Sequence, residues 1–167
     1  MFFGDPAIGL IRRFLTFLAK MGLSVRDDPK KEVDIAGRAW GAPVDGLALS
    51  ILHTPNERSD GLATVSVAIH NRGAAPLRLT TRGWLYFFQV SVVGGGTAAE
   101  LTPYGRELMK PERQPAPRVV VLAPGEAVEA DIPIGSIYRM LTGTYRVRAS
   151  CEARDGRVES NEIVIGG

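Results

Sequence analysis

The sequence predicts a mainly β protein, in which an antiparallel β-sandwich follows an N-terminal amphipathic helix. Between residues 119 and 166, short alternating runs are separated by Pro-Gly, Gly-Ser, Thr-Gly and Asp-Gly turns. Residues 144–153 alternate most regularly, and we expect Val147 and Cys151 to point inward while Arg146 and Arg148 point outward. A period of two marks a strand with one buried face, and turns at this spacing are typical of sandwiches.

Composition limits the functions that the chain can have. The chain has 167 residues, of which 45% are hydrophobic, with a formal charge of +2 and one cysteine. This is enough apolar material for the core of one domain. The small charge, with no basic run interleaved with aromatic residues, argues against nucleic acid as a partner. A single cysteine excludes an internal disulfide and a metal site built from cysteines alone.

The first predicted element is an amphipathic helix over residues 6–21. Asp5 is a suitable N-cap, Pro6 occupies the first helical position, and Gly22 is a suitable C-terminal stop. Its apolar arc is broad and its polar stripe carries only positive charge. That combination is typical of helices that lie on a membrane surface or on a partner protein.

We therefore treat residues 1–23 as a helical arm that docks on a partner or a membrane, with packing on the sandwich as the alternative. The predicted docking residues of the arm are Phe2, Phe3, Ile8, Ile11, Arg12, Phe14, Leu15, Leu18 and Met21.

The arm fits neither a secretory signal peptide nor a membrane span. Asp5 lies where a signal peptide is basic, and Arg12, Arg13 and Lys20 interrupt the apolar stretch. No uncharged run reaches the length of about 18 residues that a spanning helix needs. We expect a protein that is cytoplasmic or peripheral to a membrane, rather than one that is exported and cleaved.

A charged linker over residues 24–45 is predicted to join the arm to a sandwich over residues 46–167. Trp40, in the linker, is a further predicted docking residue. Within the sandwich, residues 85–93 are predicted to form one strand. Residues 104–118 have no periodicity and are predicted to form a long surface loop. This loop is an alternative binding site, and its candidate contact residues are Tyr104, Arg106 and Arg113.

The predicted core follows from the inward positions of the strands. We expect burial of Val67, Phe88, Val121, Ile132 and Val147. His53 ends the first strand on the core-facing register, and Cys151 is expected to act as a small buried apolar residue. The acidic residues Glu126, Glu129 and Asp131 are assigned to a solvated strand face.

Motifs that carry chemistry are missing from the sequence. It has no Gly-x-Ser-x-Gly, no Ser-x-x-Lys, no phosphate loop, and no His or Cys spacing typical of a metal site. The run of glycines at 94–96 lies between two predicted strands, so it indicates a hairpin turn. We predict no catalytic residue, no metal and no cofactor.

Several segments resemble a class of bacterial immunoglobulin-like modules. They are the opening WGAPVDGLALSI (residues 40–51), AIHN (68–71), LAPGE (122–126), GTYRV (143–147) and SNE (160–162). The group resembles the intracellular proteinase-inhibitor domains of bacilli and the β-rich domains beside some metalloproteases. The resemblance covers residues 40–166 and implies an immunoglobulin-like sandwich with a role in binding, inhibition or scaffolding. It implies no catalytic residue, and the arm lies outside it.

The sequence therefore predicts a non-catalytic accessory or structural subunit that docks on a larger assembly, soluble or membrane-bound, through the arm and the sandwich loops. Its predicted partners are other protein subunits, with a membrane surface as a second expectation. An intracellular protease inhibitor that uses the loop of residues 104–118 is the first alternative. A small-ligand-binding module is the second.

Overall fold

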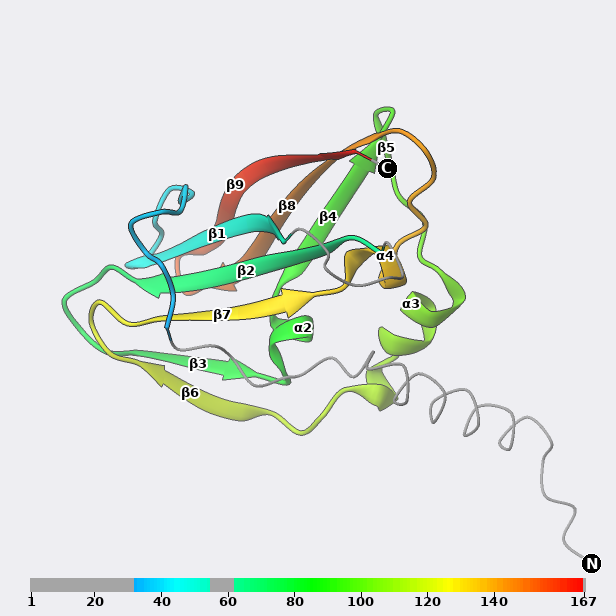
Figure 1. Ribbon diagram of the computed structural model, residues 1–167. Coiled ribbons are helices and arrows are strands. Elements are labelled where there is room, and N and C mark those ends of the chain that lie inside the picture. Colours follow the sequence, from blue (N-terminus) through cyan, green and yellow to red (C-terminus); the bar gives the residue numbers. More distant parts are fainter. Residues whose placement is uncertain (1–31, 55–61, 167) are drawn as a thin grey trace, which may run out of the picture.

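The computed structural model describes residues 32–54 and 62–166, and within them the chain is mainly β with antiparallel sheets (Figure 1). One sheet has the order β1-β2-β7, formed by Leu47–Thr54, Thr64–Asn71 and Ala127–Ile132. Its alternation places one face inward: Ile51, Val67 and Ala130 lie in one row across the three strands and are all buried.

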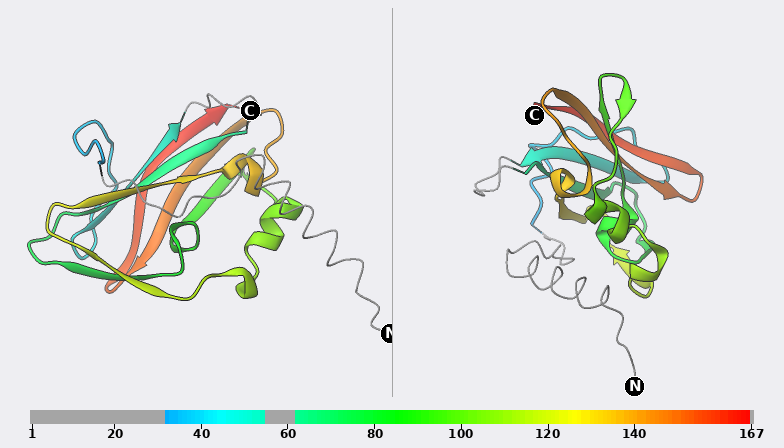
Figure 2. Two further views of the ribbon diagram at one scale, coloured as in Figure 1. Left: turned by 60° about the horizontal axis from the view of Figure 1, so that its bottom comes forward. Right: turned by 90° about the vertical axis from the view of Figure 1, so that its right-hand side faces the viewer.

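The second large sheet has the order β5-β4-β8-β9, formed by Thr97–Ala98, Gln89–Gly94, Thr144–Ala153 and Gly156–Gly166. Its strands cross behind β1-β2-β7 at an angle, so that the two sheets form two layers (Figures 1 and 2). A separate pair, β3 (Leu77–Thr81) and β6 (Arg118–Leu122), lies beyond β7 in Figure 1. Although β6 and β7 are consecutive in the chain, they pair with different strands, β3 and β2.

One apolar core lies between the layers. Its largest fully buried side chain is Trp84, whose ring stacks on Phe88 at a centroid distance of 5.7 Å. Four of the five predicted core residues are buried: Val67, Phe88, Ile132 and Val147. The prediction was wrong for the fifth, because Val121 is 51% exposed. Among the described strands, β6 pairs with β3 alone, and no other described sheet covers the face on which Val121 lies.

The prediction of one strand over residues 85–93 was wrong in its first half. Trp84–Phe87 forms a single helical turn, α2, and the strand β4 starts only at Gln89. In a strand, Trp84 and Leu85 would face opposite sides, whereas the helical turn buries both together with Phe88. Gly83 permits the turn because its φ is 114°, a conformation that side chains disfavour.

The prediction of a long surface loop over residues 104–118 was also wrong. Pro103–Leu108 forms helix α3, and Pro111–Arg113 forms a 3-10 turn, η1. Thr102 caps α3, because its Oγ1 accepts a hydrogen bond from the Gly105 N–H at 2.9 Å. Gly105 packs on the short helix α4 (Ile134–Ile137), where a Cβ would lie 2.2 Å from the Ile137 carbonyl oxygen.

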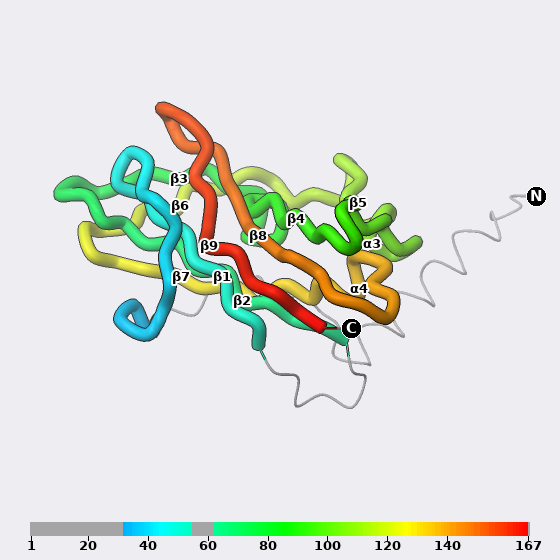
Figure 3. Tube along the Cα trace, turned by 90° about the horizontal axis from the view of Figure 1, so that it is seen from above, coloured from blue at the N-terminus to red at the C-terminus, as the bar shows by residue number. Residues whose placement is uncertain are grey.

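A tyrosine at the start of β8 is hydrogen-bonded to the segment that leads into this strand. The Tyr145 hydroxyl accepts a hydrogen bond from the Leu141 N–H at 2.6 Å, four residues upstream. Beside β8, β9 runs along β1 of the other sheet (Figure 3). There Gly41 donates its N–H to the Leu49 carbonyl at 2.9 Å, and a Cβ on Gly41 would lie 1.8 Å from the Glu159 carbonyl oxygen. Only glycine fits at position 41, because the backbone there lies close to the backbones of both β1 and β9.

Two polar assignments from the sequence need correction. His53 is exposed rather than core-facing. Glu129 is not on a freely solvated face: it is ion-paired with Arg38, whose side chain is 4% exposed. Arg38 lies in the predicted linker, so residues around it pack against the outer face of β2 and β7.

The predicted arm, residues 1–23, lies outside the described residues, as do the docking residues assigned to it. Within residues 32–54 and 62–166, no helix is long and apolar enough to cross a membrane.

Candidate functional site: the arginine face

The outer face of the β4-β8-β9 sheet is hollowed by a depression of about 280 Å³. We call its lining the arginine face, which consists of Ser91, Val93, Arg146, Arg148, Ala149, Ser150, Arg157, Glu159 and Glu162. The strands place these side chains by alternation: Val147 and Val92 point into the core, so Arg146 and Arg148 point outward. Cross-strand pairing then sets Ser91, Arg148 and Glu162 in one row.

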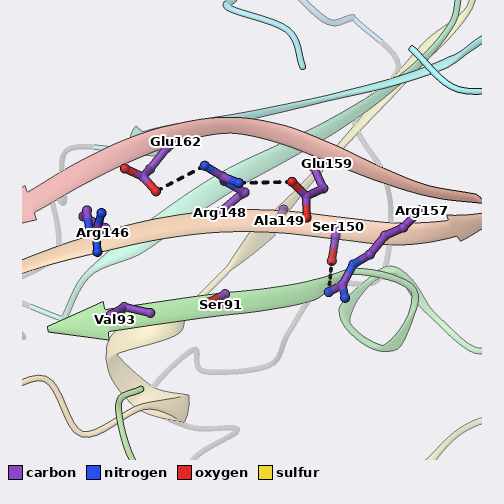
Figure 4. Close-up of a pocket in the computed structure, with 9 residues that line it drawn as sticks. All are labelled: Ser91, Val93, Arg146, Arg148, Ala149, Ser150, Arg157, Glu159 and Glu162. Carbon is purple, nitrogen blue, oxygen red and sulfur yellow. Dashed lines mark hydrogen bonds and ion pairs between the residues drawn. The ribbon is translucent and has the colours of Figure 1, made fainter. Parts of the chain in front are cut away.

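Arg148 is held between two carboxylates (Figure 4). Its Nη1 lies 3.0 Å from Glu159 Oε2, and its Nη2 lies 3.3 Å from Glu162 Oε2. A register shift between Arg148 and Ser150 brings both glutamates of β9 within reach of one arginine of β8. The three side chains are between 37% and 51% exposed. Exposed ion pairs of this kind contribute about 0–1 kcal/mol, so a ligand can exchange with them at little cost.

The other two arginines of the face differ in how they are held. Arg157 donates from Nη2 to Ser150 Oγ at 2.6 Å and to Gln89 Oε1 at 3.1 Å. These acceptors are neutral, so its charge is not neutralised by them. Arg146, which lies in a row between Val93 and Val164, has no ion pair or hydrogen bond within the described part of the chain.

The chemistry of the arginine face is that of an anion-binding surface. Three guanidinium groups and two carboxylates line the depression, which leaves one net positive charge. Guanidinium groups bind carboxylate or phosphate oxygens through two parallel hydrogen bonds. Val93 beside Arg146 and the exposed Val164 (63%) add apolar contact area at one end. A segment that carries an acidic group next to an apolar side chain matches this arrangement.

Trp40, the docking residue predicted in the linker, contacts the protein's own sheet. Its ring lies against His70 at a centroid distance of 5.2 Å, and its Nε1 donates to the Ile35 carbonyl at 3.0 Å. Burial, and then the charge of Arg72, lower the pKa of His70. Trp40 remains partly exposed, but these contacts indicate that it secures residues 35–40 to β2.

The residues of the predicted alternative loop are held by helical structure. The Arg106 side chain donates to the Leu101 carbonyl at 2.8 Å, and Arg113 pairs with Glu107 at 2.9 Å. Hydrogen bonds from Lys110 and Arg113 lower the pKa of Glu107. Tyr104 is half-buried, and this burial, followed by the effect of Tyr86, raises its pKa. Tyr104 and Arg106 lie in α3 and Arg113 lies in η1, so the three side chains come from two separate helical segments.

Residues that follow α3 form one wall of a second, mostly apolar depression of about 250 Å³. Met109 and Gln114 face α2 and α4 across it. The Tyr138 hydroxyl donates to the Val90 carbonyl at 2.7 Å, and burial raises the pKa of Tyr138. Because Gln89 lines this depression and also binds Arg157, the two depressions adjoin at the start of β4.

Groups suited to metal binding or nucleophilic attack do not gather in the described residues. In the described residues, no group of three or more His, Cys, Asp or Glu side chains is placed to hold a metal ion. Cys151 is 1% exposed, and burial, followed by the charge of Glu152, raises the pKa of its thiol to about 12. A thiol in that state is a poor nucleophile at neutral pH.

Sequence reasoning placed Arg146 and Arg148 outward but did not identify them as a site. The signal that was available is their spacing of two residues on one strand. The rest depends on pairing: Arg157, Glu159 and Glu162 join them only through the register of β8 with β9.

No family model matches the chain, and no curated protein matches it. Among solved structures, the chain is similar to the crystal structure of the GAE domain of GGA2p from Saccharomyces cerevisiae. The match has 8% sequence identity and a TM-score of 0.26, and covers 78% of this chain and 96% of that chain.

Proposed function

We propose that the protein is a non-catalytic accessory subunit that binds another protein, and that the arginine face receives an acidic segment of that partner. The observation that carries the proposal is Arg146: a guanidinium group without an ion-pair partner in the described residues, next to a depression of about 280 Å³. In a surface whose other charges are already paired or hydrogen-bonded, this group is available to a ligand carboxylate.

We further infer that the fold is an immunoglobulin-like sandwich. The strand order β1-β2-β7 opposite β4-β8-β9 corresponds to the A-B-E and C-F-G strands of that fold. The hydrogen bond between Tyr145 and Leu141 corresponds to the tyrosine corner that precedes or begins the F strand in such domains. In this interpretation, β3 and β6 form an additional pair: β3 lies in the chain between the B and C strands, and β6 lies between the C and E strands.

The helical arm remains part of the proposal as a second docking element. It motivates the prediction of a larger assembly, with a membrane surface as the alternative target of the arm. Removal of residues 1–23 from the full chain separates these roles. We expect the truncated protein to stay folded but no longer to co-purify with the membrane or complex that the full chain binds. Unfolding of the truncated protein would instead make the arm part of the core.

The arginine face is tested by charge reversal. We expect Arg146→Glu to reduce by at least about tenfold the recovery of partner proteins that the full chain captures from its native cells. Arg154→Glu is the matched control, because Arg154 is an exposed arginine on the β8–β9 turn outside the depression. Equal loss in both variants would indicate a general charge effect, and no loss in Arg146→Glu would refute the proposed role of this face.

A further inference from the structure

Among the described sheets, β6 is an edge strand with an unusual composition. It pairs with β3 on one side, and in the described part of the structure no strand pairs with its other side. Val119 and Val121 point outward and are 54% and 51% exposed, while Val120 lies between them on the opposite face. An edge strand presents free backbone N–H and C=O groups, so a second strand can add to it.

Several other strands at the edges of the described sheets have their backbone groups occupied. On β1, Gly41 and the side chain of Asn161 occupy backbone groups of Leu49 and Ile51. On β4, the Val90 carbonyl accepts from Tyr138, and the Val92 carbonyl accepts from the Ala99 N–H.

Charge and length also protect some strands. β7 carries two acidic residues, and β5 has only two residues. Natural proteins use such devices to prevent edge pairing. Within β6 there is no lysine, proline or bulge.

We propose that β6 is a dimerisation edge, at which two copies of the chain pair antiparallel with Val120 on the twofold axis. The two β3-β6 pairs then join into one four-stranded sheet. In this register Val119 of each copy lies opposite Val121 of the other copy. Each exposed valine therefore gains a valine as its cross-strand neighbour. The surface is self-complementary, as a twofold interface requires.

The flanking prolines select this register. Pro117 precedes β6 and Pro124 follows it. A proline cannot donate a ladder hydrogen bond, so the paired stretch ends before either one is reached. When the pairing is centred on Val120, the segment Arg118–Leu122 of one copy pairs with the same segment of the other copy over all five residues. A shift of the centre by one residue toward either end brings a proline opposite a residue of the strand.

The size of the contact argues for a weak dimer. Stable interfaces bury more than about 1,000 Å² in total, and two five-residue strands bury less than that. The two Arg118 side chains lie at opposite ends of the paired stretch, so they do not oppose one another. The net charge of +2 per chain gives little general repulsion. We therefore expect a dimer that forms as concentration rises.

Sedimentation equilibrium of the full chain tests the proposal. The weight-average mass should rise from that of an 18.0 kDa monomer toward twice that value as concentration increases. A range from ~10 µM to ~1 mM suits so small an interface. The Val119→Glu/Val121→Glu variant puts carboxylates opposite one another and should remain monomeric. Val164→Glu, at an exposed valine of β9, is the control and should dimerise like the parent.

Disulfide trapping tests the register without relying on a charged variant. Residues opposite each other on antiparallel strands have Cα atoms about 4.5–5.5 Å apart, which suits a disulfide. The native Cys151 is buried, so it gives little background. Val120→Cys should form a disulfide-linked dimer several-fold faster than Val119→Cys, although position 119 is the more exposed.

Three results would overturn the proposal. They are a monomer at every concentration, dimerisation that persists in Val119→Glu/Val121→Glu, or cross-linking at position 119 as fast as at position 120. A monomeric parent would leave this edge available to a strand of another protein.

Discussion

The side-chain amide of Asn161 in β9 binds the backbone of Ile51 in β1 at both of its hydrogen-bonding groups. Nδ2 of Asn161 donates to the Ile51 carbonyl at 3.0 Å, and Oδ1 accepts from the Ile51 N–H at 2.9 Å. β1 and β9 belong to different sheets. One amide therefore supplies the bonds that a neighbouring strand would otherwise make, and it joins the two layers at one edge.

Replacement of Asn161 should lower stability in proportion to these two bonds. We expect Asn161→Leu to reduce the free energy of unfolding by about 2–4 kcal/mol, because Ile51 is fully buried and both of its backbone groups lose their partner. Urea unfolding measures the change. Glu162→Gln, at the next residue but on the exposed face, should change stability by less than about 0.5 kcal/mol. A similar loss in both variants would contradict the role assigned to Asn161.

Arg38 and Glu129 should be energetically coupled. The Arg38 guanidinium also donates to Ser66 Oγ at 2.7 Å, and its side chain is 4% exposed, against 15% for that of Glu129. Removal of one partner from a buried pair leaves an uncompensated charge. We expect the cycle of Arg38→Met and Glu129→Gln to show a coupling energy of about 1–3 kcal/mol. The exposed pair Arg148–Glu159 is the control, and its coupling should be below about 1 kcal/mol.

Two valines on different strands should respond differently to the same change. Val147 is fully buried, so Val147→Asp places a charge in the core and should cost about 4 kcal/mol or more, enough to unfold much of the protein. Val121→Asp should cost less than about 1 kcal/mol because Val121 is 51% exposed. Thermal unfolding followed by circular dichroism compares them. A Val147→Asp variant that melts like the parent would show that the strand register is wrong.

The thiol of Cys151 should be inert in the folded protein and should titrate late. Burial raises its pKa from 9.0 to about 12, so the unfolded chain loses this proton first. The stability that the neutral thiol contributes is complete below pH 9 and declines as the pH rises toward 12. The decline is at most ~1.4 kcal/mol per pH unit.

The free energy of unfolding between pH 8 and pH 11 should therefore fall more steeply for the parent than for Cys151→Ala. A disulfide thiol reagent at pH 8 should label Cys151 only after urea is added. Rapid labelling of the native protein would show that the strand opens more readily than its burial implies.

The arginine face could be predicted only in part from the sequence. The alternation of residues 144–153 correctly placed Val147 and Cys151 inward and Arg146 and Arg148 outward. A period of two is a local property that any reader of the sequence can detect. The glutamates that bind Arg148 come from β9, and a register shift in the pairing selects them. No local pattern encodes that shift.

By itself the sequence determined that the chain is mainly β, and it determined most of the strand positions and most of the core, because alternation and turn residues act within a few residues of one another. Tertiary structure decided the rest. Trp84–Phe87 forms a helical turn, and this turn places the side chains of Trp84, Leu85 and Phe88 in the core together. Arg38 became buried because Glu129 and Ser66 receive it from other strands. Val121 stayed exposed because no other sheet of the described residues covers its face of the pair β3-β6, and burial depends on what lies opposite a strand rather than on its own pattern.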